Sequence, residues 1–364
     1  MTGIHVRSAL DWKRVLRTVQ LALVPCALFG MWNIGRQASG AMRSLGVEAA
    51  PGWRGDVLDL LGVGIDPTGV VGNLCHGALY LVPCYLVALA VGVAWKALFA
   101  LARRRRATEG VSLTALLFAL TLPPAIPLWQ VALGMSFGVV IVEELFGGAG
   151  RNFVNVPLAA RAFVYFGYPA DNAGNAVWVA VDGYTSATPL TAVSMSAPTT
   201  GLGALPCTWS DAFLGTMPGA MGETSTLACL LGAAVLVVTG VGSWRIMVSM
   251  LTGGALTALF FNAVGSATNP MFLMPPEWHV VTGGFAFGLV FLATDPVTAA
   301  QTDLGRWIYG FLVGLFCVLI RVLNPGYSES MMIVIILGNV FAPLIDWFVI
   351  QVNIRRRRAR HAGS

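Results

Sequence analysis

Long runs of apolar residues constrain the fold of this chain more than any other feature of its sequence. Many of them reach the roughly 20 residues that a helix needs to cross a bilayer, and the run over residues 70–100 exceeds that length. Of the 364 residues, 56% are hydrophobic and only 11% are charged, whereas soluble domains carry about 25% charged residues. Within lipid every backbone polar group must find its partner inside the chain, which favours helices. The sequence therefore predicts an all-α polytopic membrane protein.

The apolar runs predict about ten transmembrane helices. Their expected ranges are residues 18–35, 70–100, 112–127, 129–146, 157–169, 224–243, 246–264, 280–297, 306–323 and 330–351. About ten crossings would bring the C-terminus back to the side of the N-terminus. The arginine clusters at 103–106 and 355–358 would then lie on that same side, as the positive-inside rule requires of cytoplasmic segments. We therefore expect both termini in the cytoplasm.

The net charge of +5 does not indicate nucleic-acid binding, because the basic residues are clustered beside apolar runs and are not spread over a surface. The six cysteines show no Cys-x-x-Cys motif and no metal-ligand spacing with the four histidines. Most of the cysteines lie inside apolar runs, where they behave as small hydrophobic side chains. We expect neither a metal site nor a disulfide framework.

A polar interval divides the chain into three parts. Residues 1–169 form an N-terminal membrane half, residues 170–222 an extracytoplasmic loop, and residues 223–364 a C-terminal membrane half with a basic tail. Proline and glycine interrupt spans in both halves, and broken helices at membrane depth are tolerated where they line a cavity.

Two equal spacings in the sequence raise the question whether the two membrane halves are an inverted repeat. The separation from Pro127 to Asn155 equals that from Pro296 to Asn324. This agrees with an inverted repeat of broken helices, and equally with coincidence.

The extracytoplasmic loop contains the run 182–189, Asp-Gly-Tyr-Thr-Ser-Ala-Thr-Pro. Asp-Gly favours a turn and Pro189 prevents helix continuation, so we expect an exposed loop with an accessible Thr188 hydroxyl. Composition alone indicates only a solvated loop. The order of the residues, however, resembles the signal at which a flavin transferase attaches FMN to the last threonine through a phosphodiester. By that resemblance Thr188 carries FMN, while Asp182 and Ser186 either guide the transferase, neighbour the phosphate or stabilise the turn.

Further motifs resemble one family over nearly the whole chain, the family of B subunits of the sodium-translocating NADH:quinone oxidoreductases (Nqr). The D subunit of the related Rnf complex shares the flavin motif and the fold, but His5 and the basic end after Asn353 look more like the Nqr family. The motifs that carry the resemblance are Leu122–Gln130, Glu143–Gly148, Arg151–Asn155, Gly219–Ser225, Gly283–Gly288, Ala293–Pro296, Arg321–Pro325 and Phe341–Asp346.

The resemblance implies a ten-helix bundle with inverted halves in the bacterial inner membrane, surrounded by lipid. It also implies an electron-transfer subunit of an ion-transporting NADH:ubiquinone reductase, inactive alone and assembled with the A, C, D, E and F subunits of the Nqr complex. Electrons would pass from the covalent FMN through a bound riboflavin to ubiquinone, with coupled transport of Na⁺ or H⁺.

The resemblance also implies residue roles. Asn152 and Asn155 would bind riboflavin, because carboxamides can meet both donor and acceptor edges of its ring; helix capping is the alternative. Gly92, Phe163 and Tyr165 would contact the quinone, although aromatic residues near an interface are usually packing residues.

Acidic residues inside a membrane are costly, so they indicate a function. Asp295 and Asp346 match acidic positions that the family associates with sodium movement. Glu144 is a further candidate for the ion path, although Glu144 and its neighbour Glu143 could simply reach interfacial water. Lys96 stands where the family usually has a glutamate. A cation cannot ligate sodium, so we expect sodium coupling to be weakened or replaced by proton coupling.

Two other functions fit the sequence. One is the Rnf D subunit, whose physiological partner is ferredoxin and which would need no quinone site. The other is a flavin-free channel or secondary transporter, since bundles with broken helices also serve transport. A covalent chromophore would distinguish both flavoproteins from the transporter.

Overall fold

The computed structural model describes residues 12–47, 50, 52–64, 66–104, 109–172, 188–197, 201–324, 327 and 329–362. These residues form helices and contain no β-strand, which confirms the predicted all-α class. The N-terminal half consists of α1 (Trp12–Leu45), α2 (Trp53–Leu60), α3 (Val70–Arg103), α4 (Val111–Thr121), α5 (Leu128–Phe137), η1 (Gly138–Glu144) and α6 (Val156–Gly167). The C-terminal half consists of α10 (Thr226–Val238), α11 (Trp244–Val264), η4 (Pro270–Leu273), α12 (Pro276–Val281), α13 (Phe285–Phe287), η5 (Gly288–Leu292), α14 (Asp303–Leu323) and α15 (Met331–Ala362). Between them lie α7 (Pro169–Asn172), α8 (Pro189–Ser194), η3 (Gly201–Ala204) and α9 (Trp209–Leu214).

Five of the described helices are long and apolar enough to cross a membrane, namely α1, α3, α11, α14 and residues Met331–Arg360 of α15. The shorter apolar helices are α4, α6 and α10. This confirms a polytopic membrane protein. The two remaining predicted spans are the broken ones, and they coincide with α5–η1 and with α12, α13 and η5. Because short and broken helices contribute, the number of ten crossings stays a prediction.

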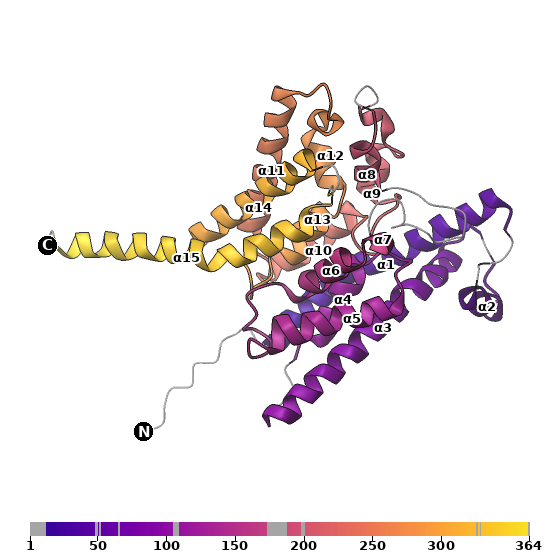
Figure 1. Cartoon of the computed structure of the whole chain (residues 1–364), viewed down its shortest axis with the longest axis horizontal. Helices are drawn as coiled ribbons and strands as arrows, with labels where there is room; N and C mark the ends of the chain where they lie inside the picture. The colour runs from indigo at the N-terminus through magenta and orange to yellow at the C-terminus, as the bar shows by residue number, and fades with distance from the viewer. Residues whose placement is uncertain are drawn as a thin grey trace.

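Glycines allow the long helices to pack closely. In the α1–α3 pair, a Cβ added to Gly35 would overlap the main chain of Asn73, and one added to Gly77 would overlap the carbonyl of Met31. Small residues at such contacts let helix backbones approach in a membrane, where van der Waals packing drives association. Figure 1 shows α1 and α3 side by side at one flank of the bundle.

The pair α11–α14 is built in the same way as α1–α3. A Cβ on Gly253 would overlap the carbonyl of Phe311, and one on Gly314 would overlap the carbonyl of Met250. One tightly packed helix pair therefore supports each half, and the broken helices lie against these pairs.

Each half contains a stretch of π-helix, η1 or η5, which begins at a Phe-Gly pair. After η1 the chain turns through Gly147, Gly148 and Gly150, whose φ values of 111°, 98° and 86° favour glycine, and Asn155 then begins α6. After η5 a turn leads to Thr302, which caps α14. Both halves thus repeat a π-helix, a turn and a capped helix.

The equal intervals in the sequence do not correspond to this repeat. Pro127 precedes α5 and Asn155 begins α6, whereas Pro296 follows η5 and Asn324 ends α14. The four residues therefore occupy non-equivalent places, and their matched spacing is coincidental.

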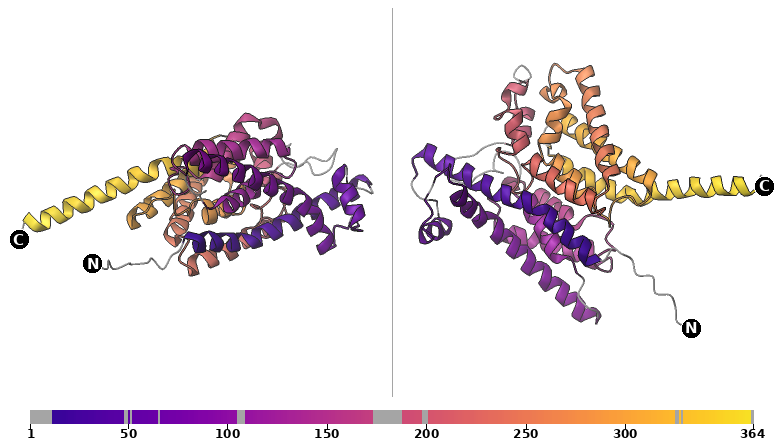
Figure 2. Two further views of the ribbon diagram at one scale, coloured as in Figure 1. Left: turned by 90° about the horizontal axis from the view of Figure 1, so that it is seen from below. Right: turned by 180° about the vertical axis from the view of Figure 1, so that it is seen from behind.

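Helix α15 extends beyond the bundle. Figures 1 and 2 show its last turns projecting away from the remaining helices. Its arginines at 355–358 are exposed there, so the basic tail is available to solvent or to charged lipid headgroups.

Candidate functional site

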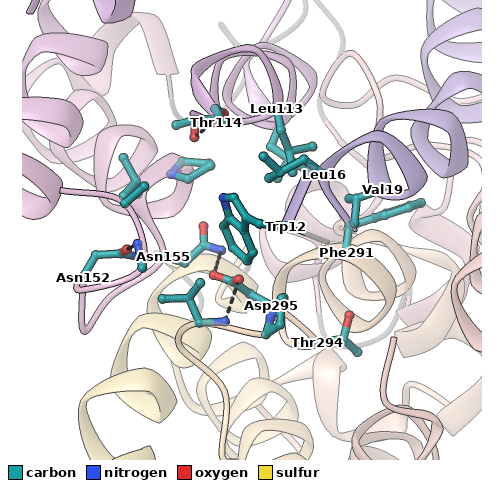
Figure 3. Close-up of a pocket in the computed structure, with 18 of the residues that line it drawn as sticks. Trp12, Leu16, Val19, Leu113, Thr114, Asn152, Asn155, Phe291, Thr294 and Asp295 are labelled. Carbon is teal, nitrogen blue, oxygen red and sulfur yellow. Dashed lines mark hydrogen bonds between the residues drawn. The ribbon is translucent and has the colours of Figure 1, made fainter. Parts of the chain in front are cut away.

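A cavity of about 100 Å³ lies where α1, α4, the loop before α6 and the turn after η5 meet. Figure 3 shows side chains from both halves converging on it. Its walls include Trp12, Leu16, Val19, Leu113, Thr114, Asn152, Asn155, Phe291, Thr294 and Asp295. The structure thus brings together the two predicted riboflavin residues and one predicted ion-path acid.

Asn155 connects the two halves at this cavity. Its Oδ1 accepts a hydrogen bond from the Leu158 backbone N–H at 3.2 Å, which caps the N-terminus of α6. Its Nδ2 donates to Asp295 Oδ2 at 3.1 Å. The carboxamide therefore performs the capping role considered from the sequence, and it also faces the cavity.

Asn152 holds the loop before α6. Its Oδ1 accepts from the Gly150 backbone N–H at 3.3 Å, and its Nδ2 donates to the Val154 carbonyl at 3.0 Å. A carboxamide has two N–H donors and two acceptor lone pairs, so these bonds leave capacity for a ligand.

Asp295 is held by short-range hydrogen bonds within the turn after η5. Its carboxylate accepts from the Val297 backbone N–H at 3.1 Å and from the Thr298 hydroxyl at 2.9 Å, in addition to the bond from Asn155. These donors stabilise a carboxylate that lines the cavity without a basic partner among the described residues.

The lining suits a flat aromatic ligand in its chemistry. The rings of Trp12 and Phe291 offer stacking surfaces, and the two asparagines offer donors and acceptors. The volume is below the roughly 300 Å³ at which small-molecule pockets begin. The donor set is therefore compatible with a flavin ring in its chemistry, while the volume of the cavity is smaller than such a ring needs.

The other two predicted ion-path acids lie apart from this cavity. Glu144 Oε2 is 3.0 Å from Arg103 Nη1, so this buried carboxylate is neutralised at the end of α3. Asp346 on α15 accepts from the backbone N–H groups of Gln301 at 2.7 Å and Thr302 at 2.9 Å. It thereby fixes the start of α14 to α15.

A large apolar groove of about 660 Å³ lies on the other side of the loop before α6. It is lined by Phe137, Ile141, Val142, Phe146, Phe153, Val154, Ala159, Ala162, Phe163, Phe166, Gly167 and Ile336. The loop therefore presents Asn152 and Asn155 to the inner cavity, and Phe153 and Val154 to the groove.

The structure does not bring the three predicted quinone residues together. Phe163 lines the groove and stacks on Phe137 with ring centroids 4.4 Å apart. Tyr165 lines a different, internal cavity, and Gly92 lies in close contact with Met135 in the packed interior.

Thr188 is buried, with 3% of its surface exposed, so the expectation of an accessible hydroxyl is wrong for this structure. The residue precedes α8, which packs Leu190 and Val193 into an apolar cluster with residues of α11 and α14. The Thr188 hydroxyl lies 2.9 Å from that of Thr191. Asp182 and Ser186 lie outside the described residues.

Comparison with known proteins shows the family of this chain. The sequence model of the NQR2, RnfD, RnfE family matches residues 1–355. The chain belongs to this family. It is 52% identical over 361 residues to the B subunit of the Na(+)-translocating NADH-quinone reductase of Chromohalobacter salexigens, with 99% of this chain and 87% of the relative covered. It is 50% identical over 362 residues to the protein of the same name from Pseudomonas aeruginosa strain LESB58, and 48% identical over 365 residues to that from Neisseria meningitidis serogroup A, covering 99% of this chain and 89% of each relative.

One further polar network was not expected from the sequence, and it joins Arg161, Asn172, Gln130 and Asp171. Arg161 donates to Asn172 Oδ1 at 3.1 Å, and Asn172 donates to Gln130 Oε1 at 3.0 Å. Gln130 in turn donates to Asp171 Oδ2 at 2.5 Å. The signal that could have found the network is the presence of a glutamine and an arginine, Gln130 and Arg161, inside predicted membrane spans.

Proposed function

We propose that the chain is an electron-transfer subunit of an ion-transporting NADH:quinone oxidoreductase. The observation that carries this proposal is identity of 48–52% over 99% of the chain to proteins named as the B subunit of a Na(+)-translocating NADH-quinone reductase. As a subunit, it would act in the bacterial inner membrane, with both termini cytoplasmic, together with the other Nqr subunits.

Thr188 is the proposed attachment residue for FMN, joined by a phosphodiester. Support comes from its place at the end of the Asp-Gly-Tyr-Thr-Ser-Ala-Thr run and from the proline that follows it. Because the hydroxyl is buried against Thr191, attachment by a flavin transferase must precede or interrupt the packing of α8.

Riboflavin is proposed to bind in the cavity beside Asn152 and Asn155. It would supply a redox centre within the membrane part of the protein. The chain itself provides hydrogen-bonding amides on a fixed helix cap, and apolar side chains that exclude water around them.

The groove beside Phe163 is the proposed site for the isoprenoid tail of ubiquinone. Its lining is apolar and rich in phenylalanine, and Phe146, Phe153 and Phe166 are each more than two-fifths exposed. Such a surface accommodates an apolar chain and leaves a headgroup close to the loop that separates the groove from the inner cavity.

The Rnf D subunit is the second candidate, because the matching family model includes Rnf subunits. The names of the relatives at 48–52% identity favour the Nqr function. Subunits that co-purify with the chain distinguish the two.

The decisive experiment is ultraviolet fluorescence of the denatured, gel-separated chain from a host that has the flavin transferase. We expect a fluorescent band for the wild type and for Thr191→Ala, and none for Thr188→Ala. Thr191→Ala is the matched control, since it removes a hydroxyl 2.9 Å away from the proposed attachment oxygen. A dark wild-type band would refute the flavoprotein function, and fluorescence that survives in Thr188→Ala would refute the attachment residue.

A further inference from the structure

A polar cavity that has no part in the proposed function lies between the end of α10, the start of α11 and the turn before α14. Its volume is about 200 Å³, and its wall includes Ser243, Trp244, Arg245, Gln301 and Arg306. A water molecule needs only about 10–15 Å³ of such space. The cavity can therefore hold a polar group that is much larger than water.

Two arginines, Arg245 and Arg306, converge at this cavity. Arg245 Nη1 lies 3.2 Å from Asp303 Oδ1, and Arg306 Nη1 lies 3.8 Å from the same oxygen. Arg306 Nε also donates to the Ala300 carbonyl at 3.4 Å, which orients its guanidinium group. Two guanidinium groups that meet at one oxygen are close enough to bind different oxygens of one phosphate group, whose geometry the planar guanidinium matches.

The pairing with Asp303 leaves both arginines able to bind another anion. The Asp303 side chain is 73% exposed, and ion pairs at a surface contribute little free energy. Each guanidinium group has five N–H donors, most of which the contacts with Asp303 and Ala300 do not use. A phosphate group in the cavity could therefore bind the arginines without displacing the aspartate.

The charges in the wall also favour an anion. Asp295 opposes it, but this carboxylate already accepts hydrogen bonds from Val297, Thr298 and Asn155. The first turn of α11 forms part of the wall and has no side-chain cap, so the positive end of its helix dipole adds to the charge of the two arginines.

The cavity lies at the membrane boundary. Helices α11 and α14 are both long enough to cross a membrane, and they begin beside the cavity at Trp244 and Asp303. The partly exposed rings of Trp244 and Trp307 pack edge to face with centroids 5.8 Å apart, and tryptophan is typical of the headgroup level of a bilayer. Through Asp346, helix α15 binds the turn before α14, and it then continues into the exposed arginines at 355–358. The cavity is therefore on the side of the basic tail.

We propose that this cavity binds a phosphate group, supplied by the headgroup of an anionic phospholipid from the leaflet on the side of the basic tail. Basic pockets between transmembrane helices on the cytoplasmic side bind such headgroups. Arg245 and Arg306 hold the phosphate oxygens, and the two tryptophans lie at the level of the headgroup. The acyl chains follow the outer side of α11 and α14, where Val248 and Ile308 are exposed.

The test is native mass spectrometry of the purified intact complex titrated with phosphatidylglycerol, which counts bound lipids one by one. We expect the combined change Arg245→Gln and Arg306→Gln to weaken one bound phosphatidylglycerol by about tenfold or more, because charged hydrogen bonds are lost. Arg36→Gln is the matched control and should bind as the wild type does. Arg36 lies 5.4 Å over the ring of Trp32, as Arg245 does over Trp244, but it lies away from the cavity.

A second binding experiment distinguishes a lipid from free phosphate. Delipidated complex is dialysed against phosphorus-32 inorganic phosphate. Arginine-dependent binding of phosphate without arginine-dependent binding of phosphatidylglycerol would keep the phosphate site and refute the lipid as its source. Binding of neither probe that depends on the two arginines would overturn the proposal.

The variant Asp303→Asn covers the case in which the double arginine variant does not fold. It removes the exposed carboxylate that competes for both guanidinium groups and leaves the arginines in place. The proposal requires phosphatidylglycerol to bind more tightly to this variant than to the wild type, and unchanged or weaker binding would overturn it. Binding is measured without NADH or quinone, so the result is independent of the proposed redox function.

Discussion

The side-chain amide of Asn155 donates a hydrogen bond to the carboxylate of Asp295 over 3.1 Å, and this contact joins the loop before α6 to the turn after η5. The same side chain caps α6 through the Leu158 backbone N–H. One residue therefore sets both the start of a helix and the relation between two broken segments from different halves of the chain.

Substitutions at Asn155 should separate these two roles. Asn155→Ala removes both bonds, and we expect a loss of about 1 kcal/mol for the cap and about 1 kcal/mol for the bond to Asp295. Asn155→Ser keeps a cap acceptor and loses only the bond to Asp295. Thermal unfolding of the detergent-purified protein should rank wild type above Asn155→Ser and Asn155→Ala lowest. Equal stabilities of the two variants would contradict a separate role for the cap.

Close packing of α1 on α3 should make Gly35 intolerant of a methyl group. A Cβ there would overlap the main chain of Asn73, whereas one at Gly40 on the same helix would meet nothing within 4 Å. We expect Gly35→Ala to lower the free energy of unfolding by about 1–3 kcal/mol through overpacking. Gly40→Ala should be neutral, or stabilising by up to about 1 kcal/mol, because alanine loses less entropy in a helix. Both are measured by thermal unfolding, and similar effects at the two sites would refute the close contact.

Quinone binding in the groove should depend on the ring of Phe163. Phe163→Ala removes an aromatic ring from the wall of the groove, and we expect the quinone KM of the assembled complex to rise by up to about tenfold, since burial of an apolar contact of this size contributes about 1.5 kcal/mol. Tyr165→Phe is the control, because Tyr165 lines another cavity, and its KM should not change. Steady-state kinetics check both, with covalent fluorescence as a measure of intact protein. An unchanged KM in Phe163→Ala would place the quinone elsewhere.

The carboxyl of Asp211 in the capping box of α9 should titrate below the ordinary aspartate value. Hydrogen bonds from the Thr208 hydroxyl and backbone N–H lower its pKa, and the Thr216 hydroxyl adds a smaller effect in the same direction. Because the pKa is depressed on folding, the stabilisation is present above the unfolded value near 3.9 and is lost as the pH falls through the folded pKa. Carbon-13 NMR of labelled aspartate should show the pKa rising more in Thr208→Ala than in Thr216→Ala. The reverse order would contradict the capping geometry.

The positions of the helices could be predicted from the sequence, because each depends on a local run of apolar residues. The expected ranges 246–264 and 306–323, for example, coincide closely with α11 and α14. Cap chemistry is also local, and the helix-cap interpretation of Asn155 describes the structure, while its role in binding riboflavin stays a prediction.

Burial and pairing could not be predicted in the same way, because they depend on segments far apart in the chain. The sequence neighbours of Thr188 predict an accessible hydroxyl, yet the packing of α8 on α11 and α14 buries it. The sequence presents Lys96 as an unfavourable cation on an ion path, and only the fold shows that Glu143 from η1 neutralises it.

The loop before α6 contributes lining residues to both the inner cavity and the apolar groove. Its amides at Asn152 and Asn155 face the inner cavity, and its apolar residues Phe153 and Val154 face the groove. The proposed riboflavin in the cavity and the proposed quinone tail in the groove would both contact this loop. Adding or deleting one residue between Gly150 and Asn155 would turn the amides toward lipid and the phenylalanine inward, so this segment should accept exchanges of side chain far more readily than changes of length.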